Sequence, residues 1–84
     1  MSGAVVTDPA APNASQHTFG DTTLDEQEIA LIRLLAEGLV LDAVARRLGI
    51  SERTLRRRIR ALCDRIGVDT PVQVIVWAAR VGVL

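Results

Sequence analysis

The chain has 84 residues, and its ten basic and ten acidic side chains give a formal net charge of zero. A chain of this length forms one small domain, and an aromatic content of 2% requires an aliphatic core, which suits packed helices. The single cysteine excludes an internal disulfide, and no run approaches the roughly 20 apolar residues that a membrane-spanning helix needs. These features predict a cytoplasmic, all-α protein.

The first part of the chain lacks the patterns of regular structure. Residues 1–22 combine glycine, proline, serine and threonine without apolar periodicity, so that burial cannot offset the entropy cost of ordering them. We therefore expect a disordered tail or linker over residues 1–22 and a folded domain over residues 23–84.

The next segments carry the start signals of two helices. Asp25 and Glu28 have the spacing of a capping box, which predicts a first helix over about residues 25–37. A second, short helix is expected over about residues 41–48. Val40 would occupy its N-cap, where a valine side chain cannot accept a hydrogen bond, a deficit of about 1 kcal/mol.

A tight turn follows the second helix. Gly49 can adopt the left-handed conformation that ends a helix, and Ser51 is suited to cap the next helix after a turn of about three residues. Ala45 is small enough for two helices that meet at about 90 to 120° to approach closely. This spacing predicts a helix-turn-helix.

The third helix has two different faces. Four apolar residues share one stripe, which we assign to the core: Leu55, Ile59, Leu62 and Ile66. Four arginines project together on nearly the opposite side: Arg53, Arg56, Arg57 and Arg60. Residues 46–65 hold eight arginines against two acids, a net charge of +6, whereas residues 1–37 have a net charge of −5. A solvated surface is the alternative, but the segregated charge and the preceding turn predict DNA binding in the major groove.

The fourth helix begins with Thr70 as its N-cap and Pro71 at the first helical position. Gln73, three residues after Thr70, can bond through its side chain to the N-cap backbone N–H, as in a capping box. Its apolar side chains surround more of the helix than one small core can cover. We expect a homodimer through this helix, with two recognition helices roughly 34 Å apart on an inverted repeat of double-stranded DNA. A core helix wrapped by the N-terminal tail is the alternative. The expected interface residues are Val72, Ile75, Val76 and Ala79.

Several motifs together resemble the LuxR-type (NarL/FixJ-like) helix-turn-helix domain: Glu28-Ile29, residues 34–39, residues 45–51, Thr54 and Gly67-Val68. The resemblance covers about residues 24–84. It implies a four-helix DNA-binding output domain of bacterial transcription regulators, which often dimerises through the fourth helix. It also implies that Thr54 contacts a phosphate and that Arg56, Arg57 and Arg60 approach bases or backbone in the major groove.

The full set of predicted DNA contacts is Arg46, Ser51, Arg53, Thr54, Arg56, Arg57 and Arg60. Arg56 is the leading base reader, because a guanidinium group can donate two parallel hydrogen bonds to guanine. The chain departs from the family pattern at residues 40–42 and at Arg58, where the family commonly has histidine. These departures indicate DNA contacts that differ from those of typical members.

Two other functions remain open. A promoter-binding domain of a sigma factor would bind RNA polymerase as a monomer, and a protein-interaction adaptor would use the arginines on an acidic partner. An enzyme is not expected, because the only histidine, His17, lies in the expected tail and no nucleophile, base and acid come together. No cofactor or metal is expected, and Cys63 is assigned to the core. The chain is either an excised effector domain or a free-standing regulator.

Overall fold

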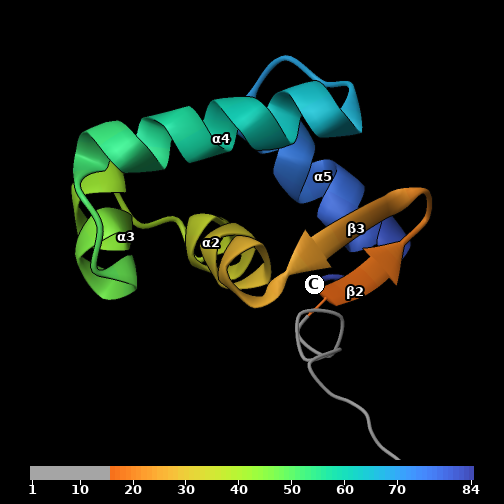
Figure 1. Ribbon diagram of the computed structural model, residues 1–84, viewed down its shortest axis with the longest axis horizontal. Coiled ribbons are helices and arrows are strands. Elements are labelled where there is room, and N and C mark those ends of the chain that lie inside the picture. Colours follow the sequence, from red (N-terminus) through yellow and green to blue (C-terminus); the bar gives the residue numbers. More distant parts are fainter. Residues whose placement is uncertain (1–15) are drawn as a thin grey trace, which may run out of the picture.

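The computed structural model describes residues 16–84, which form a two-stranded hairpin followed by four helices (Figure 1). The strands are β2 (Gln16–Phe19) and β3 (Thr22–Asp25), and the helices are α2 (Glu26–Ala36), α3 (Leu41–Leu48), α4 (Glu52–Ile66) and α5 (Pro71–Val81). The predicted four-helix domain is confirmed, with the hairpin added to it. None of the helices in residues 16–84 has both the length and the apolar character needed to cross a membrane.

The hairpin lies in a segment for which the sequence predicts no regular structure. Strands β2 and β3 are antiparallel, with Phe19 opposite Thr22, and Gly20 begins the turn with a φ of 59°. The hairpin is anchored because Leu24 is fully buried and Phe19 packs against the core. The expectation of a disordered tail is therefore wrong for residues 16–22. The rest of that expected tail lies outside the described residues, and the division of the chain at residue 23 stays a prediction.

The helices begin where the capping signals place them. The carboxylate of Asp25 accepts from the backbone N–H of Glu28 at 2.8 Å, and Glu28 accepts from the N–H of Asp25 at 2.9 Å, which completes the predicted capping box of α2. Thr70 and Gln73 form the second capping box, at the start of α5. Val40 makes no side-chain hydrogen bond to α3, as its chemistry predicts. Tertiary packing therefore has to hold α3 in place.

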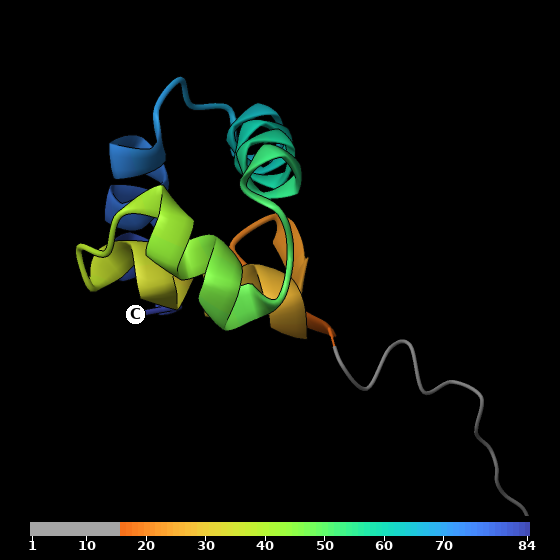
Figure 2. The same ribbon diagram turned by 90° about the vertical axis from the view of Figure 1, so that its left-hand side faces the viewer.

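The core is built from aliphatic side chains of the hairpin and all four helices. Helix α2 packs against α3 and α5, and α4 packs against the same two helices. Figure 1 shows α4 across one side of the domain, with α3 near one of its ends and α5 near the other, and Figure 2 shows the same arrangement turned by 90°. No polar or charged side chain is buried among the described residues. The buried residues are Leu24, Ile29, Leu31, Ile32, Val44, Ala45, Leu55, Ile59, Leu62, Cys63, Val74, Ala78 and Val83.

Candidate nucleic-acid interface

Helices α3 and α4 and the turn between them form a helix-turn-helix. Gly49 ends α3 with a φ of 71°, and its N–H donates to the carbonyl of Arg46 at 3.2 Å. The N–H of Ile50 donates to the carbonyl of Ala45 at 3.0 Å, which completes a Schellman motif. Ala45 is buried, as the close approach of two helices requires. The turn thus depends on a glycine in the left-handed conformation and on a small residue one turn before it.

The start of α4 carries two of the predicted DNA contacts, Ser51 at the N-cap and Thr54 in the first turn. The hydroxyl oxygen of Ser51 accepts from the N–H of Thr54 at 3.0 Å, and the hydroxyl group donates to Oγ1 of Thr54 at 3.0 Å. Ser51 is exposed and Thr54 is half-buried. Both side chains are therefore held beside the start of α4, which is the part of a recognition helix that meets base edges.

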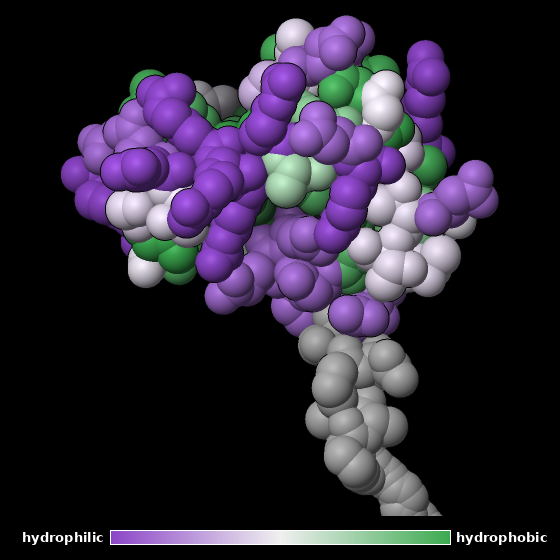
Figure 3. All heavy atoms as spheres, turned by 45° about the horizontal axis from the view of Figure 1, so that its top comes forward, coloured by the Kyte–Doolittle hydropathy of each residue, from purple (hydrophilic) through white to green (hydrophobic). Residues whose placement is uncertain are grey.

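Helix α4 presents its four outward arginines on one surface, which we name the arginine face: Arg53, Arg56, Arg57 and Arg60. All four are exposed, and the opposite stripe of the helix is buried through Leu55, Ile59 and Leu62. Figure 3 shows hydrophilic side chains gathered over the side of the molecule on which α4 lies. The predicted two-faced helix is present, with Ile66 half-buried at its end.

Some of the predicted contact arginines lie beside carboxylates of their own helix. Arg56 pairs with Glu52 at 2.7 Å, Arg46 with Asp42 at 3.5 Å, and Arg60 with Asp64 at 3.9 Å. All three pairs are exposed and join residues four apart, and such pairs contribute about 0.3 to 0.5 kcal/mol each. Phosphates can therefore displace these carboxylates at little cost.

Arg53 and Arg57 differ from their neighbours, because neither forms an ion pair within residues 16–84. The acidic partners of the other arginines were not predicted, although the spacing of four residues between Glu52 and Arg56 is a sufficient signal. The local carboxylates lower the positive charge of the arginine face without removing it.

Two further arginines of α4 point toward the N-terminal half of the domain. Arg58 donates from Nη1 to Oε1 of Gln27 on α2 at 2.6 Å. Arg65 pairs with Glu28 at 3.0 Å and donates to the carbonyl of Thr23 at 3.2 Å. Neither residue shares the arginine face, as the helical spacing predicts. Gln27 was not among the predicted site residues, and its contact with Arg58 depends on tertiary packing between segments 31 residues apart.

Helix α5 exposes an apolar surface, which we name the α5 face and which consists of the predicted interface residues Val72, Ile75, Val76 and Ala79. Val72 is 67% exposed and Val76 is 47% exposed, whereas Val74 and Ala78 of the same helix are fully buried. Ala79 is exposed and Ile75 is half-buried. One side of α5 therefore completes the core, and the other leaves apolar surface open to solvent.

Cys63 lies in the core, as predicted. It is 2% exposed, and its side chain belongs to the same cluster as Leu62 and Val74. Burial raises the pKa of the Cys63 thiol, and the carboxylates of Asp64 and Asp69 raise it further, while Arg60 opposes them. The thiol is therefore protonated at neutral pH, which is the unreactive state.

Comparisons with known proteins agree with this geometry. Residues 23–68 match the family model described as the Homeodomain-like domain. The chain is 31% identical over 64 residues to the Transcriptional regulatory protein YdfI of Bacillus subtilis (strain 168), a match that covers 76% of this chain and 30% of that protein. It is 43% identical over 61 residues to the Bialaphos biosynthetic pathway regulatory protein of Streptomyces hygroscopicus, a match that covers 73% of this chain and 24% of that protein.

The chain thus spans less than a third of the length of these two curated relatives. No solved structure matched the chain. The matched residues 23–68 include α4, which carries the arginine face, and α2, α3 and the Gly49 turn, which position it. The chain therefore belongs to the Homeodomain-like family of helix-turn-helix domains, with regulatory proteins among its relatives.

Proposed function

We propose that the chain is a sequence-specific DNA-binding domain of a bacterial transcription regulator, of the LuxR type, and that it acts in the cytoplasm. The observation that carries the proposal is the arginine face, because four exposed guanidinium groups share one side of the helix that follows the turn. Family membership and the two regulatory relatives support it. A binding role of this kind needs no cofactor, metal or catalytic residue.

In this proposal α4 enters the major groove with the arginine face toward the bases. Arg56 is the proposed base reader, since a bidentate contact of arginine with guanine O6 and N7 is worth about 1 to 3 kcal/mol of discrimination. Its partner Glu52, at 2.7 Å, would be released as the guanidinium turns to the base. Arg53, Arg57 and Arg60 would contact phosphates, together with Arg46, Ser51 and Thr54.

A homodimer through the α5 face completes the proposal. The exposed Val72 and Val76 supply apolar surface that a second copy would bury. A two-fold axis at this face would relate two recognition helices, which fits an inverted repeat with half-sites roughly 34 Å apart. A monomer that binds RNA polymerase, as a sigma-factor domain would, leaves this apolar surface without a role.

A protein-interaction adaptor is the second candidate, and one observation favours it. A carboxylate already lies within 4 Å of each of three arginines, Arg46, Arg56 and Arg60. These guanidinium groups can therefore pair with acidic side chains in this geometry. An acidic protein segment would then replace the DNA phosphates. Both candidate functions use the arginine face, so an experiment distinguishes them by which ligand binds, DNA or an acidic protein segment.

The decisive experiment is selection from a pool of random DNA duplexes by the whole chain at two salt concentrations. We expect enrichment of an inverted repeat, with retention that falls as salt rises, because binding releases counterions. The Arg57→Gln variant should retain less DNA, whereas the matched Arg33→Gln variant, which removes an exposed charge from α2, should behave as the unaltered chain. If the unaltered chain retains no duplex at low salt, the DNA-binding proposal fails and the adaptor remains.

A further inference from the structure

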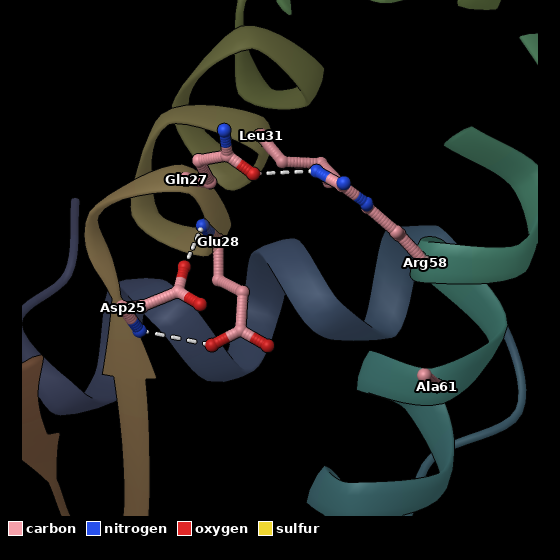
Figure 4. A pocket seen from close by; sticks show the side chains of 6 residues that line it. All are labelled: Asp25, Gln27, Glu28, Leu31, Arg58 and Ala61. Carbon is pink, nitrogen blue, oxygen red and sulfur yellow. Dashed lines mark hydrogen bonds between the residues drawn. The ribbon is translucent and has the colours of Figure 1, made fainter. Parts of the chain in front are cut away.

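A crevice separates the first turn of α2 from the middle of α4, beside the arginine face. Its volume is about 270 Å³. Figure 4 shows Gln27 and Arg58 reaching toward each other across it from the two helices, joined by their hydrogen bond. The residues that line it are Asp25, Gln27, Glu28, Leu31, Arg58 and Ala61. Ala61 has the smallest side chain of the six, which helps to keep this space open.

The hydrogen bond between Gln27 and Arg58 leaves several donors free. Oε1 of Gln27 accepts from one guanidinium nitrogen of Arg58 at 2.6 Å. Within residues 16–84, the Gln27 amide nitrogen and the other guanidinium nitrogens of Arg58 make no hydrogen bond. Because a glutamine amide has two N–H donors and a guanidinium group has five, the pair presents adjacent donors and a positive charge with few competing acceptors. A phosphodiester oxygen is the acceptor that such a pair suits.

The position of Arg58 on α4 is also that of a phosphate contact. Each residue turns an α-helix by about 100°, so Arg58 lies one step around α4 from Arg57, on the side that faces α2. Thr54 lies four residues before Arg58 and therefore on the same side of the helix. When a helix lies in a major groove about 12 Å wide, the phosphates of the two strands flank it. With the arginine face toward the bases, Thr54, Arg58 and Gln27 would follow one flanking strand.

The carboxylates in the crevice are already engaged. Asp25 and Glu28 accept backbone N–H groups at 2.8 and 2.9 Å in the capping box, and Glu28 also pairs with Arg65 at 3.0 Å. Their remaining negative charge would repel a phosphate that entered the crevice deeply. The site for a phosphate is therefore the rim formed by Gln27 and Arg58.

We propose that Gln27 and Arg58 form a two-helix clamp for one phosphate of the DNA backbone, and that this clamp fixes the orientation of α2 on the duplex. The inference rests on the proposed DNA-binding function and adds to it a contact outside the arginine face. In this role Gln27 is a positioning residue that holds the guanidinium of Arg58 toward the strand and adds its own amide donor. The contact is with the backbone, so it supplies affinity and register but no base preference.

The test measures the affinity of the whole chain for a selected duplex between about 50 and 200 mM salt, by fluorescence anisotropy. Each lost phosphate contact reduces the magnitude of the slope of log K against log salt by about 0.9, so the ratio of affinities across that fourfold range changes roughly 3.5-fold. The proposed homodimer would lose two such contacts, roughly a 12-fold change in that ratio. We expect this loss in Arg58→Gln. Gln27→Glu should show a similar loss, because its carboxylate pairs with Arg58 and repels the phosphate. Arg33→Gln, which removes an exposed arginine about 120° around α2 from Gln27, should keep the original slope.

The outcomes separate this inference from the function on which it rests. If the unaltered chain binds duplex DNA and both clamp variants keep its slope, the clamp is refuted and the DNA-binding proposal stands. If the unaltered chain does not bind DNA, both fail. Thermal unfolding of each variant identifies a loss caused by misfolding. If Arg58→Gln does not fold, the salt dependence of Gln27→Glu tests the clamp instead. Gln27 is exposed, and glutamate has nearly the same shape as glutamine, so this variant should fold.

Discussion

The N-terminus of α3 offers a direct test of how local chemistry sets the stability of the helix-turn-helix. Val40 has a φ of −69° and a ψ of 155°, almost the values of Ser51, at −73° and 156°. Ser51 caps its helix through its hydroxyl oxygen, whereas Val40 makes no cap. A serine at position 40 would therefore already have the backbone needed to accept from the N–H of Asp42, since the N–H of Ala43 already donates to the carbonyl of Val40 at 3.0 Å. We expect Val40→Ser to supply the missing N-cap.

The size of the effect follows from two opposing terms. An N-cap hydrogen bond contributes about 1 kcal/mol. Val40 is 69% exposed, so its removal forfeits only about a third of the roughly 1.5 kcal/mol that full burial of a valine provides, or about 0.5 kcal/mol. Val40→Ser should thus raise the free energy of unfolding by about 0.5 kcal/mol. Val40→Ala loses the same apolar contact without gaining a cap.

The serine and alanine variants should accordingly differ by about 1 kcal/mol, a difference in Tm of roughly 4 to 8 °C for a domain of this size. Thermal unfolding followed by circular dichroism at 222 nm checks this, with protein concentration held constant because dimerisation would itself raise Tm. If the two variants melt at the same temperature, the account of α3 as an uncapped helix held by packing is wrong.

Three further predictions concern the arginine face, the α5 face and the core. Arg56→Ala should weaken binding to the selected operator by about 1 to 3 kcal/mol in a fluorescence anisotropy titration, and unchanged affinity would remove Arg56 from the contacts. Val76→Asp should give a folded monomer in sedimentation analysis because Val76 is 47% exposed, whereas Ile75→Asp, at a half-buried site, should also lower stability; a stable dimer in both would place the interface elsewhere. Burial raises the pKa of Cys63 above its ordinary value of 9.0, so the unfolded chain releases this proton first and stability should fall as pH rises past about 9. Denaturant unfolding of Cys63→Ala should lack that decline, and identical pH dependence in the two proteins would exclude the thiol as its cause.

The helices could be predicted from sequence because their ends are set by local chemistry. The Asp25–Glu28 and Thr70–Gln73 capping boxes satisfy amide groups of their own first turns, so spacing alone identifies them. Gly49 likewise reaches the left-handed conformation without help from distant residues. The arginine face follows from helical periodicity once these ends are fixed.

The composition of residues 1–22 does not predict the hairpin, although the turn chemistry at Gly20-Asp21 favours it. Gly20-Asp21 lies between Thr18-Phe19 and Thr22-Thr23, and a glycine followed by aspartate between β-favouring residues is a hairpin signal. The strands are short, and their stability depends on burial of Leu24 and Phe19 against the helices. The helices that bury these two side chains lie after residue 25, so the pattern of residues 1–22 alone does not predict the hairpin.

The carboxylate partners of the arginines follow a local rule as well. Glu52 and Asp42 precede their arginines by four residues, and the pairs measure 2.7 and 3.5 Å. Asp64 follows Arg60 in the less favourable order, and that pair measures 3.9 Å. The contact between Arg58 and Gln27 obeys no such rule, because it joins α4 to α2 through the fold.

The arginines of α4 thus fall into two groups with different surroundings in the fold. Arg58 and Arg65 bond to α2 and β3 on one side of the helix, while Leu55, Ile59 and Leu62 are buried in the core. These contacts hold the axis of α4 in one orientation, so the helix does not have to be oriented when a ligand binds.

The outward arginines of α4 present exposed guanidinium groups on this fixed axis. Breaking the two exposed ion pairs of Arg56 and Arg60 costs about 0.6 to 1 kcal/mol in total, which one bidentate contact with guanine would offset in the proposed complex. The fold therefore fixes the orientation of the helix, while the exposed guanidinium groups can bond to different acceptors. In the proposed DNA complex, the acceptors of these guanidinium groups would be base edges or backbone phosphates of the DNA that meets α4.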